Sequence, residues 1–267
     1  MFQVRHMMCP RPGCGSRAEH VDSPMSRIIL LRHAQASFAD GGSITDGYDQ
    51  LSPLGFRQSA ALAEDLAESG TVFDRIVMGP AKRHRQTAEI VEALYEERGL
   101  PWPVPEVIDA LDEHLGAFVM TRAMEQADGD PELAGLVAGL QAGGEERMTA
   151  FFQAYRVISE RWAKEELSAE VSGEESWKAF RRRVEGALGR LIDESQDGET
   201  VGVFTSGGPA CVGAAWVLGL DDVKTMELTW VMRNASMTEL LYLLGRVVLG
   251  SFNTLPRFPS PDMVTYV

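Results

Sequence analysis

The sequence predicts an α/β fold built on a largely parallel sheet, and three observations favour it. Short aliphatic runs, such as 28–31, alternate with longer stretches whose apolar residues recur at helical spacing. Two strand-then-helix units follow one another early in the chain, an order that favours parallel pairing. The later stretch 119–175 is rich in Gly, Ala and acidic residues and resembles an inserted helical cap.

The first two units carry clear local signals. Strand 27–33 is followed by a helix over 52–70, with Ser52 as its N-cap and Pro53 at the first helical position. Strand 74–79 precedes a helix over 80–99 that contains apolar i,i+4 pairs. These signals place both strand ends just before a helix.

The second half continues the alternation. Four residues at helical spacing predict a helix inside 119–175: Phe151, Tyr155, Ile158 and Trp162. The next helix has an apolar stripe that we interpret as core and not as a cofactor platform: Trp177, Phe180, Val184, Leu188 and Leu191. In the same helix we expect the run Arg181–Arg183 to form a mostly solvated face, since successive helical residues point in different directions. Strand 200–205, a turn at 206–209, a helix over 210–220 and two strands, 237–244 and 246–252, complete the prediction.

The composition limits the function. The chain has 267 residues, of which 45% are hydrophobic and 24% charged, and no apolar run approaches the ~20 residues of a membrane span. The formal net charge of −14 disfavours binding to nucleic acid or to an anionic membrane, so an anionic ligand needs a local basic pocket. We expect a cytoplasmic enzyme or binding protein.

The N-terminal stretch 1–24 stands apart from this pattern. The chain has three thinly spread cysteines: Cys9, Cys14 and Cys211. An odd, sparse set argues against a disulfide framework and fits a reducing compartment. Cys9 and Cys14 lie between His6 and His20, but the spacing matches none of the usual zinc patterns. We therefore expect a flexible leader over 1–24 and a single domain over 25–267.

Polar residues suited to phosphate follow three of the predicted strands. Arg32 and His33 come after the first strand, Arg83 after the second, and Ser206 and Gly207 after the strand at 200–205. In an open α/β sheet the ligand crevice lies beyond the carboxyl ends of the strands, so these groups converge if the strands are neighbours.

The residue types fit phosphoryl chemistry. Guanidinium groups such as those of Arg32 and Arg83 match phosphate geometry and stay charged at any working pH. The turn at 206–208 offers backbone N–H groups at a helix N-terminus, where anions are favoured. A neutral imidazole crowded by positive charge is a good nucleophile, which assigns His33 the attack on phosphorus.

Four segments resemble one known family in content and in order: "LRHAQAS", "YDQLSPLGFRQSAALAEDL", "GPAKRHRQTAEIV" and "RNASMTELLYLL". They are similar to motifs of the histidine phosphatase superfamily, whose members include phosphoglycerate mutases and many phosphatases. The resemblance extends from about Arg27 to Asn253. It implies a three-layer α/β/α fold with a mostly parallel sheet and an inserted helical cap, and a phosphohistidine intermediate.

The resemblance also implies roles for individual residues. The family nucleophile falls on His33, its flanking arginine on Arg32 and its second arginine on Arg83. The family's proton donor falls on Glu113 of "ALDEHLG", with Asp112 as the second candidate. Such a carboxylate needs a raised pKa to donate a proton at neutral pH, and we expect desolvation under the cap to provide it.

Two departures from the family pattern bear on activity. The family's glycine after the nucleophile is Ala34, which adds a methyl beside the pocket. The family's second histidine is Ser206, which offers a neutral hydrogen bond for a charged one and should weaken transition-state binding by about 1–2 kcal/mol. We therefore expect a slowed enzyme, and expect Ser206→His to raise its rate about tenfold. His84 and His114 adjoin catalytic candidates, but we expect both side chains to point elsewhere.

The sequence thus predicts a phosphatase that acts on a small phosphorylated substrate. No cofactor is implied, and two arginines with backbone donors leave no need for a metal. A phosphoglycerate mutase is disfavoured because "AQASFADGG" lacks the Trp-Asn of family mutases. A non-catalytic phospholigand-binding or interaction protein is the other alternative, motivated by Ala34 and Ser206. Retention of His33, Arg83 and Glu113 favours the enzyme, because a binding module needs no proton donor.

Overall fold

The structure is a computed structural model that describes residues 25–37, 49–114, 116–140, 144–173, 175–243 and 245–266. The predicted leader 1–24, with Cys9 and Cys14, lies outside the described residues, as does the "FADGG" segment, 38–42, after the first strand.

One sheet organises the described residues. Its six strands are β1 (Ser26–Arg32), β2 (Arg75–Met78), β3 (Glu106–Val107), β4 (Thr200–Thr205), β5 (Met237–Leu243) and β6 (Arg246–Thr254). They lie in the order β3-β2-β4-β1-β5-β6. The pairs β3–β2, β2–β4 and β4–β1 are parallel, whereas β5 and β6 are antiparallel. The predicted α/β class with a mostly parallel sheet is confirmed.

The strand register brings the predicted site segments to one edge. Arg32, the last residue of β1, lies opposite Thr205 at the end of β4, and Met78 of β2 lies opposite Phe204. The carboxyl ends of β1, β2 and β4 are therefore adjacent. Because the chain leaves each of these strands at this edge, the residues that follow lie close together, and we refer to this place as the crevice.

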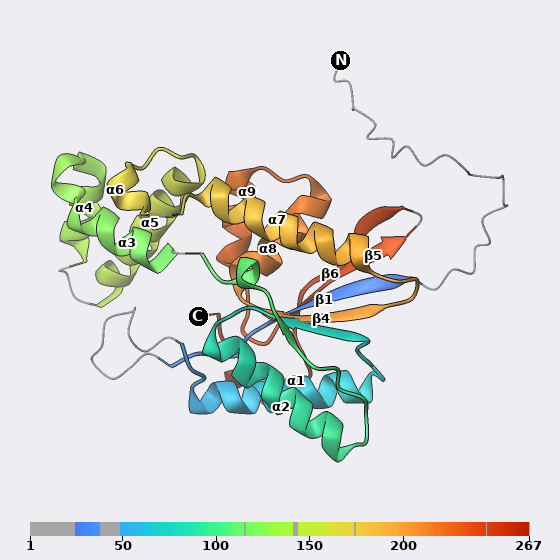
Figure 1. Cartoon of the computed structure of the whole chain (residues 1–267). Coiled ribbons are helices and arrows are strands. Elements are labelled where there is room, and N and C mark those ends of the chain that lie inside the picture. Colours follow the sequence, from blue (N-terminus) through green and yellow to red (C-terminus); the bar gives the residue numbers. More distant parts are fainter. Residues whose placement is uncertain are drawn as a thin grey trace, which may run out of the picture.

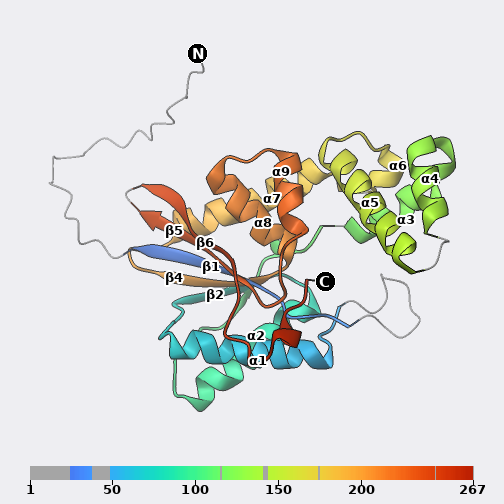
Figure 2. The same cartoon turned by 180° about the vertical axis from the view of Figure 1, so that it is seen from behind.

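Helices cover both faces of the sheet. On one face lie α1 (Pro53–Glu68) and α2 (Lys82–Glu97), and on the other α7 (Trp177–Glu194) and α8 (Gly207–Leu218), which confirms the three layers (Figures 1 and 2). The helix α9 (Asp222–Thr229) packs against α8. Ser52 caps α1 as predicted, since its side chain accepts a hydrogen bond from the Gly55 N–H at 3.0 Å.

Two apolar clusters join the layers. The predicted stripe of α7, from Trp177 to Leu191, is fully buried in the cluster on the α8 side of the sheet. The cluster on the other side contains Leu62, Val91 and Phe204 together with Ala34. The Ala34 methyl thus fills the core under the first strand. Its carbonyl, and not its methyl, serves the site described below.

A group of helices between β3 and α7 extends beyond the sheet edge (Figure 1). It comprises α3 (Gly116–Glu125), α4 (Pro131–Gly139), α5 (Gly144–Ala163) and the short α6 (Ala169–Ser172). In α5, Ile158 and Trp162 are buried against the main core, whereas Phe151 is 40% exposed. The group occupies the stretch in which the sequence predicted a helical cap.

Candidate active site

The His33 imidazole lies at the centre of the crevice. Its backbone N–H donates to the Thr205 carbonyl at 2.8 Å, so the residue continues the parallel pairing of β1 with β4. The ring Nδ1 lies 2.7 Å from the Ala34 carbonyl, and the ring Nε2 lies 3.2 Å from Nε of Arg83. A guanidinium group only donates, so Nε2 accepts and Nδ1 carries the proton. The Nε2 lone pair therefore faces the arginine.

His33 is held neutral. The side chain is buried, and burial together with the charges of Arg83 and Arg32 holds its pKa well below the usual value. A neutral imidazole with Nε2 unprotonated is the form that attacks phosphorus.

Helices α1 and α2 fix the loop that follows β1. The Gln35 N–H donates to Oε1 of Gln58 at 2.7 Å, and the Ala34 N–H donates to Oγ1 of Thr87 at 3.3 Å. A Cβ on Gly55 would lie 2.1 Å from the Gln35 carbonyl oxygen, so α1 approaches as closely as it does because that residue is glycine. Gln58 and Thr87 support the loop that follows His33, and sequence reasoning did not single them out.

Arg32 offers an unused donor. Its Nη1 donates to the carbonyls of Met232, at 2.6 Å, and of Tyr266, at 2.8 Å. Its Nε is buried and has no hydrogen-bond partner in the described part of the chain. A Cβ built on Gly207 would lie 3.3 Å from this atom, so the guanidinium packs against the start of α8. An unpaired buried N–H of a cation is an unfavourable state that an anionic ligand relieves.

Arg83 links the site residues. Beyond its bond to His33, Nη2 donates to Oγ of Ser206 at 3.3 Å, and Nη1 lies 3.4 Å from a carboxylate oxygen of Asp49. The Arg83 side chain is 10% exposed, whereas the Asp49 side chain is 64% exposed. The guanidinium is therefore anchored inside the crevice with one edge toward solvent.

The structure corrects the expectation for His84. Its Nε2 lies 2.6 Å from Oγ of Ser206, and its ring centre lies 5.7 Å from that of His33. The ring fits because Gly79 has no side chain: a Cβ there would lie 2.6 Å from the His84 Nδ1. Burial and the charge of Arg83 lower the pKa of His84 to about 3, so it is neutral. Because α2 begins at the strand end, both Arg83 and His84 reach the crevice.

Glu113 reaches the same edge of the sheet from the segment that follows β3. A 3-10 turn, Asp109–Leu111, leads into it, and the Leu111 carbonyl accepts a hydrogen bond from Oγ1 of Thr205 at 2.6 Å. One Glu113 carboxylate oxygen accepts from the N–H of Gly208 at 3.2 Å, and the other from the N–H of His114 at 3.0 Å. The carboxylate thus lies at the N-terminus of α8.

The expected raised pKa of Glu113 is wrong for the unliganded protein. Burial alone raises it, but His114, the two backbone N–H bonds and Arg83 together outweigh burial, and the pKa lies below the usual value. Burial raises the pKa of the neighbouring Asp112, whose Oδ1 accepts from the Glu113 N–H at 2.8 Å. Glu113 is therefore ionised before a substrate arrives.

His114 is enclosed by aromatic rings. Its ring meets those of Trp162, Trp177 and Phe180 edge-on, at centroid distances of 5.3–5.9 Å. Its Nε2 lies 3.7 Å from a Glu113 carboxylate oxygen. His114 thus packs beneath the cap helices and contacts the carboxylate, not the arginine-lined part of the crevice.

The prediction that the run Arg181–Arg183 forms a mostly solvated face is wrong. Arg182 is exposed, but Arg181 and Arg183 are half-buried. Arg183 donates to three carbonyls of the Glu113 segment, those of Ala110, Asp112 and Glu113, at 2.9, 2.9 and 3.1 Å. It also pairs with Glu175. Arg183 therefore holds the predicted proton donor in place, which no sequence pattern indicated.

Two other kinds of functional feature are absent from the described residues. They contain no group of three or more metal-ligating side chains. None of the helices described is both long and apolar enough to cross a membrane.

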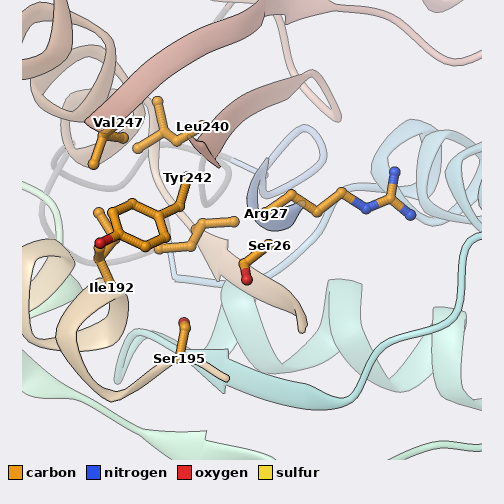
Figure 3. Close-up of a pocket in the computed structure, with 8 residues that line it drawn as sticks. Ser26, Arg27, Ile192, Ser195, Leu240, Tyr242 and Val247 are labelled. Atoms are coloured by element: carbon orange, nitrogen blue, oxygen red, sulfur yellow. The ribbon is translucent and has the colours of Figure 1, made fainter. Parts of the chain in front are cut away.

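A small hollow lies at the opposite end of β1, where the Tyr242 ring lies over Ile192 between Ser26 and Val247 (Figure 3). None of the predicted site residues lines it.

The fold and the site define an α/β protein with a buried, neutral histidine held beside two arginines. The chain belongs to the histidine phosphatase superfamily (branch 1), whose model matches residues 28–146 and 140–254. The resemblance stated from the four sequence segments is confirmed. A search of the curated proteins finds no significant match.

Solved structures share the fold at low sequence identity. A phosphoserine phosphatase variant from Entamoeba histolytica, in complex with phosphoserine, aligns with a TM-score of 0.55 and 18% identity over 86% of this chain and 97% of that chain. A mycobacterial glucosyl-3-phosphoglycerate phosphatase aligns with a TM-score of 0.56 and 23% identity over 86% and 99%. A phosphoglycerate mutase from Bacillus anthracis aligns with a TM-score of 0.58 and 17% identity over 87% and 95%.

Proposed function

We propose that the protein is a metal-independent phosphatase that hydrolyses a small phosphomonoester through a phosphohistidine on His33. The observation that carries this proposal is the state of the His33 ring. Its Nδ1 proton is fixed on the Ala34 carbonyl, and its Nε2 lone pair faces Arg83. The unpaired Nε of Arg32 supplies a second cationic donor for the phosphoryl group.

The first step transfers the phosphoryl group to the protein. Arg83 exchanges its bond to His33 Nε2 for a bond to a phosphoryl oxygen, which frees the lone pair for attack. A bond forms between Nε2 and phosphorus, the bond from phosphorus to the ester oxygen breaks, and that oxygen takes a proton from Glu113. The products of this step are the free alcohol and phosphohistidine.

The second step regenerates the protein. Water attacks phosphorus, its proton passes to the Glu113 carboxylate, the bond between nitrogen and phosphorus breaks, and inorganic phosphate leaves. Atoms and charge balance over the two steps, with Glu113 acting first as acid and then as base.

Glu113 becomes protonated when the substrate binds. The carboxylate is ionised in the free protein, but a phosphoryl dianion bound beside it favours the protonated form, because like charges raise a carboxyl pKa. Burial already raises the pKa of Asp112, which is the alternative donor.

A cytoplasmic location stays a prediction from the composition and cysteine usage.

The test compares turnover of 4-nitrophenyl phosphate by wild type, His33→Ala and Arg83→Gln, with Arg182→Gln as the matched control. Arg182 lies on α7 and is exposed. We expect phosphate release by wild type and by the control, and a loss of at least a hundredfold in the other two. Equal release by wild type and His33→Ala, or none by either, contradicts the proposal. Faster interconversion than hydrolysis of phosphoglycerates assigns a mutase instead.

A further inference from the structure

A small cavity lies where helices α3 and α5 meet α9, next to the proposed active site (Figure 1). Most of its lining is apolar and buried. Five of the side chains that line it are each no more than 7% exposed: Val119, Met120, Ile158, Trp162 and Met226. The steps proposed above use none of these residues.

His114 joins this cavity to the proposed acid. Its ring lines the cavity, and its Nε2 lies 3.7 Å from a Glu113 carboxylate oxygen. The start of α8 packs on the same ring, since a Cβ built on Gly208 would lie 2.8 Å from the His114 Cδ2. In the proposed first step Glu113 protonates the departing oxygen, so the alcohol part of the substrate lies on the side of the site that adjoins the cavity.

Tyr155 of α5 gives a second link between the cavity and the phosphoryl site. It lines the cavity. Burial, with a smaller contribution from Glu113, raises the pKa of its hydroxyl, and Thr229 and Arg32 oppose the rise. The hydroxyl is therefore within electrostatic reach of both the proposed acid and one of the two arginines.

The polar groups of the lining are neutral. Among the described residues, none of those that line the cavity is lysine, arginine, aspartate or glutamate. Tyr155 contributes a hydroxyl and Trp162 a ring N–H, whereas the Ser159 hydroxyl donates to a carbonyl of its own helix. Neutral donors do not offset a full negative charge that has been removed from water.

The histidine in the lining is committed to the acid. The His114 Nδ1 accepts a hydrogen bond from the Gly116 N–H at 2.9 Å, so the ring proton lies on Nε2, the atom that faces Glu113. Any positive charge on this ring is offset by the Glu113 carboxylate. A second anionic group on the substrate would thus meet an apolar cavity and a carboxylate, with no cation beside it.

We propose that this cavity binds the alcohol part of the substrate, and that the substrate is a phosphomonoester of an uncharged, largely apolar alcohol. The inference rests on the proposed function and deepens it by naming the substrate class. Esters with a carboxylate near the phosphate, such as phosphoserine and the phosphoglycerates, are then poor substrates, because a buried carboxylate needs a cationic partner. Met120 and Met226 have flexible, polarisable side chains, so apolar alcohols of several shapes fit.

The first test compares two substrates of the same shape and different charge. 3-Methylbutyl phosphate and 3-phosphooxypropanoate end in branched groups of similar size, which are apolar in the first and a carboxylate in the second. We expect the wild-type kcat/KM to be at least about tenfold higher for 3-methylbutyl phosphate. A smaller preference, or a preference for the carboxylate, overturns the proposal. This comparison needs no variant.

The second test places a cation in the cavity. Met120→Lys keeps a side chain of similar length, and it should shift the ratio of the two kcat/KM values at least about tenfold toward 3-phosphooxypropanoate. Met25→Lys, at a methionine that is 45% exposed just before β1, is the matched control and should leave the ratio unchanged.

A thermal melt establishes that Met120→Lys is folded. If it is not, Met120→Ala takes its place: by enlarging the cavity, it should raise kcat/KM for 2-phenylethyl phosphate relative to 3-methylbutyl phosphate at least about threefold. An unchanged ratio in the folded variant overturns the proposal.

Binding of the matching phosphonates, measured by calorimetry, separates this inference from the proposed function, because phosphonates are not hydrolysed. If 4-methylpentylphosphonate binds at least about tenfold more tightly than 4-phosphonobutanoate but no ester is turned over, the phosphatase proposal fails and the cavity assignment stands. Turnover through His33 without a preference between the two esters does the reverse. Neither turnover nor a preference in binding overturns both.

Discussion

Replacing Arg183 by Met removes the guanidinium that holds the Glu113 segment. Three carbonyl bonds at 2.9–3.1 Å are lost, together with the ion pair to Glu175. Charge-assisted bonds contribute about 1.5–3 kcal/mol each, but Arg183 is only half-buried, so we expect water to compensate part of the loss, and the Thr205–Leu111 bond remains. We expect the unfolding free energy to fall by about 2–4 kcal/mol in urea denaturation.

The effect on catalysis should depend on the leaving group. In the proposed mechanism an alkyl phosphate needs the proton from Glu113, so a poorly held Glu113 should lower its kcat about 10–100-fold. A 2,4-dinitrophenyl phosphate leaves without a proton and should lose less than about threefold. Arg182→Met, one residue away and exposed, is the matched control and should change neither rate. Equal losses on the two substrates, or a loss in the control, refute the assignment of Arg183 to positioning the acid.

Three further outcomes are expected. Gly208→Ala should lower kcat on alkyl phosphates at least tenfold, because its Cβ would lie 2.1 Å from a Glu113 carboxylate oxygen, whereas Gly189→Ala, in open space on α7, should be neutral or stabilising in a thermal melt. The free energy of unfolding in urea should fall as the pH is lowered from about 6.5 toward 3, by about 1.4 kcal/mol per pH unit for each buried neutral histidine, because these histidines take up protons only in the unfolded chain. His84→Gln should make this slope smaller. Parallel curves for wild type and His84→Gln contradict the prediction. Ser206→His should lose turnover, contrary to the expectation from sequence, because His84 Nε2 already lies 2.6 Å from the serine oxygen; a gain at unchanged circular dichroism contradicts this.

Local signals in the sequence were sufficient for much of the fold. The aliphatic run of β1, the Ser52 cap and the apolar stripe of α7 each depend on neighbouring residues alone, and each was predicted. Convergence of Arg32, Arg83 and Ser206 followed from parallel strand order. By contrast, β3 has two exposed residues and no apolar pattern, so only its pairing with β2 identifies its bounds.

The predictions from sequence that were wrong at the site all depend on the groups that surround a side chain in the folded protein. Whether His84 points into the crevice depends on where α2 begins relative to β4 and on the space above Gly79. The pKa of Glu113 depends on the Gly208 N–H and His114, which the fold brings to it, and desolvation alone predicted the wrong sign. Arg183 donates hydrogen bonds to carbonyls about seventy residues away in the chain, a contact with no sequence signature.

The most direct test of the account is to trap the intermediate. Wild-type protein mixed with 4-nitrophenyl phosphate is quenched in alkali within milliseconds, and the phosphorylated peptide is mapped by mass spectrometry. We predict acid-labile, alkali-stable phosphate on His33, formed as fast as the first turnover and absent in His33→Ala. Turnover without phosphoprotein, or phosphate on Ser206 or His84, contradicts the account.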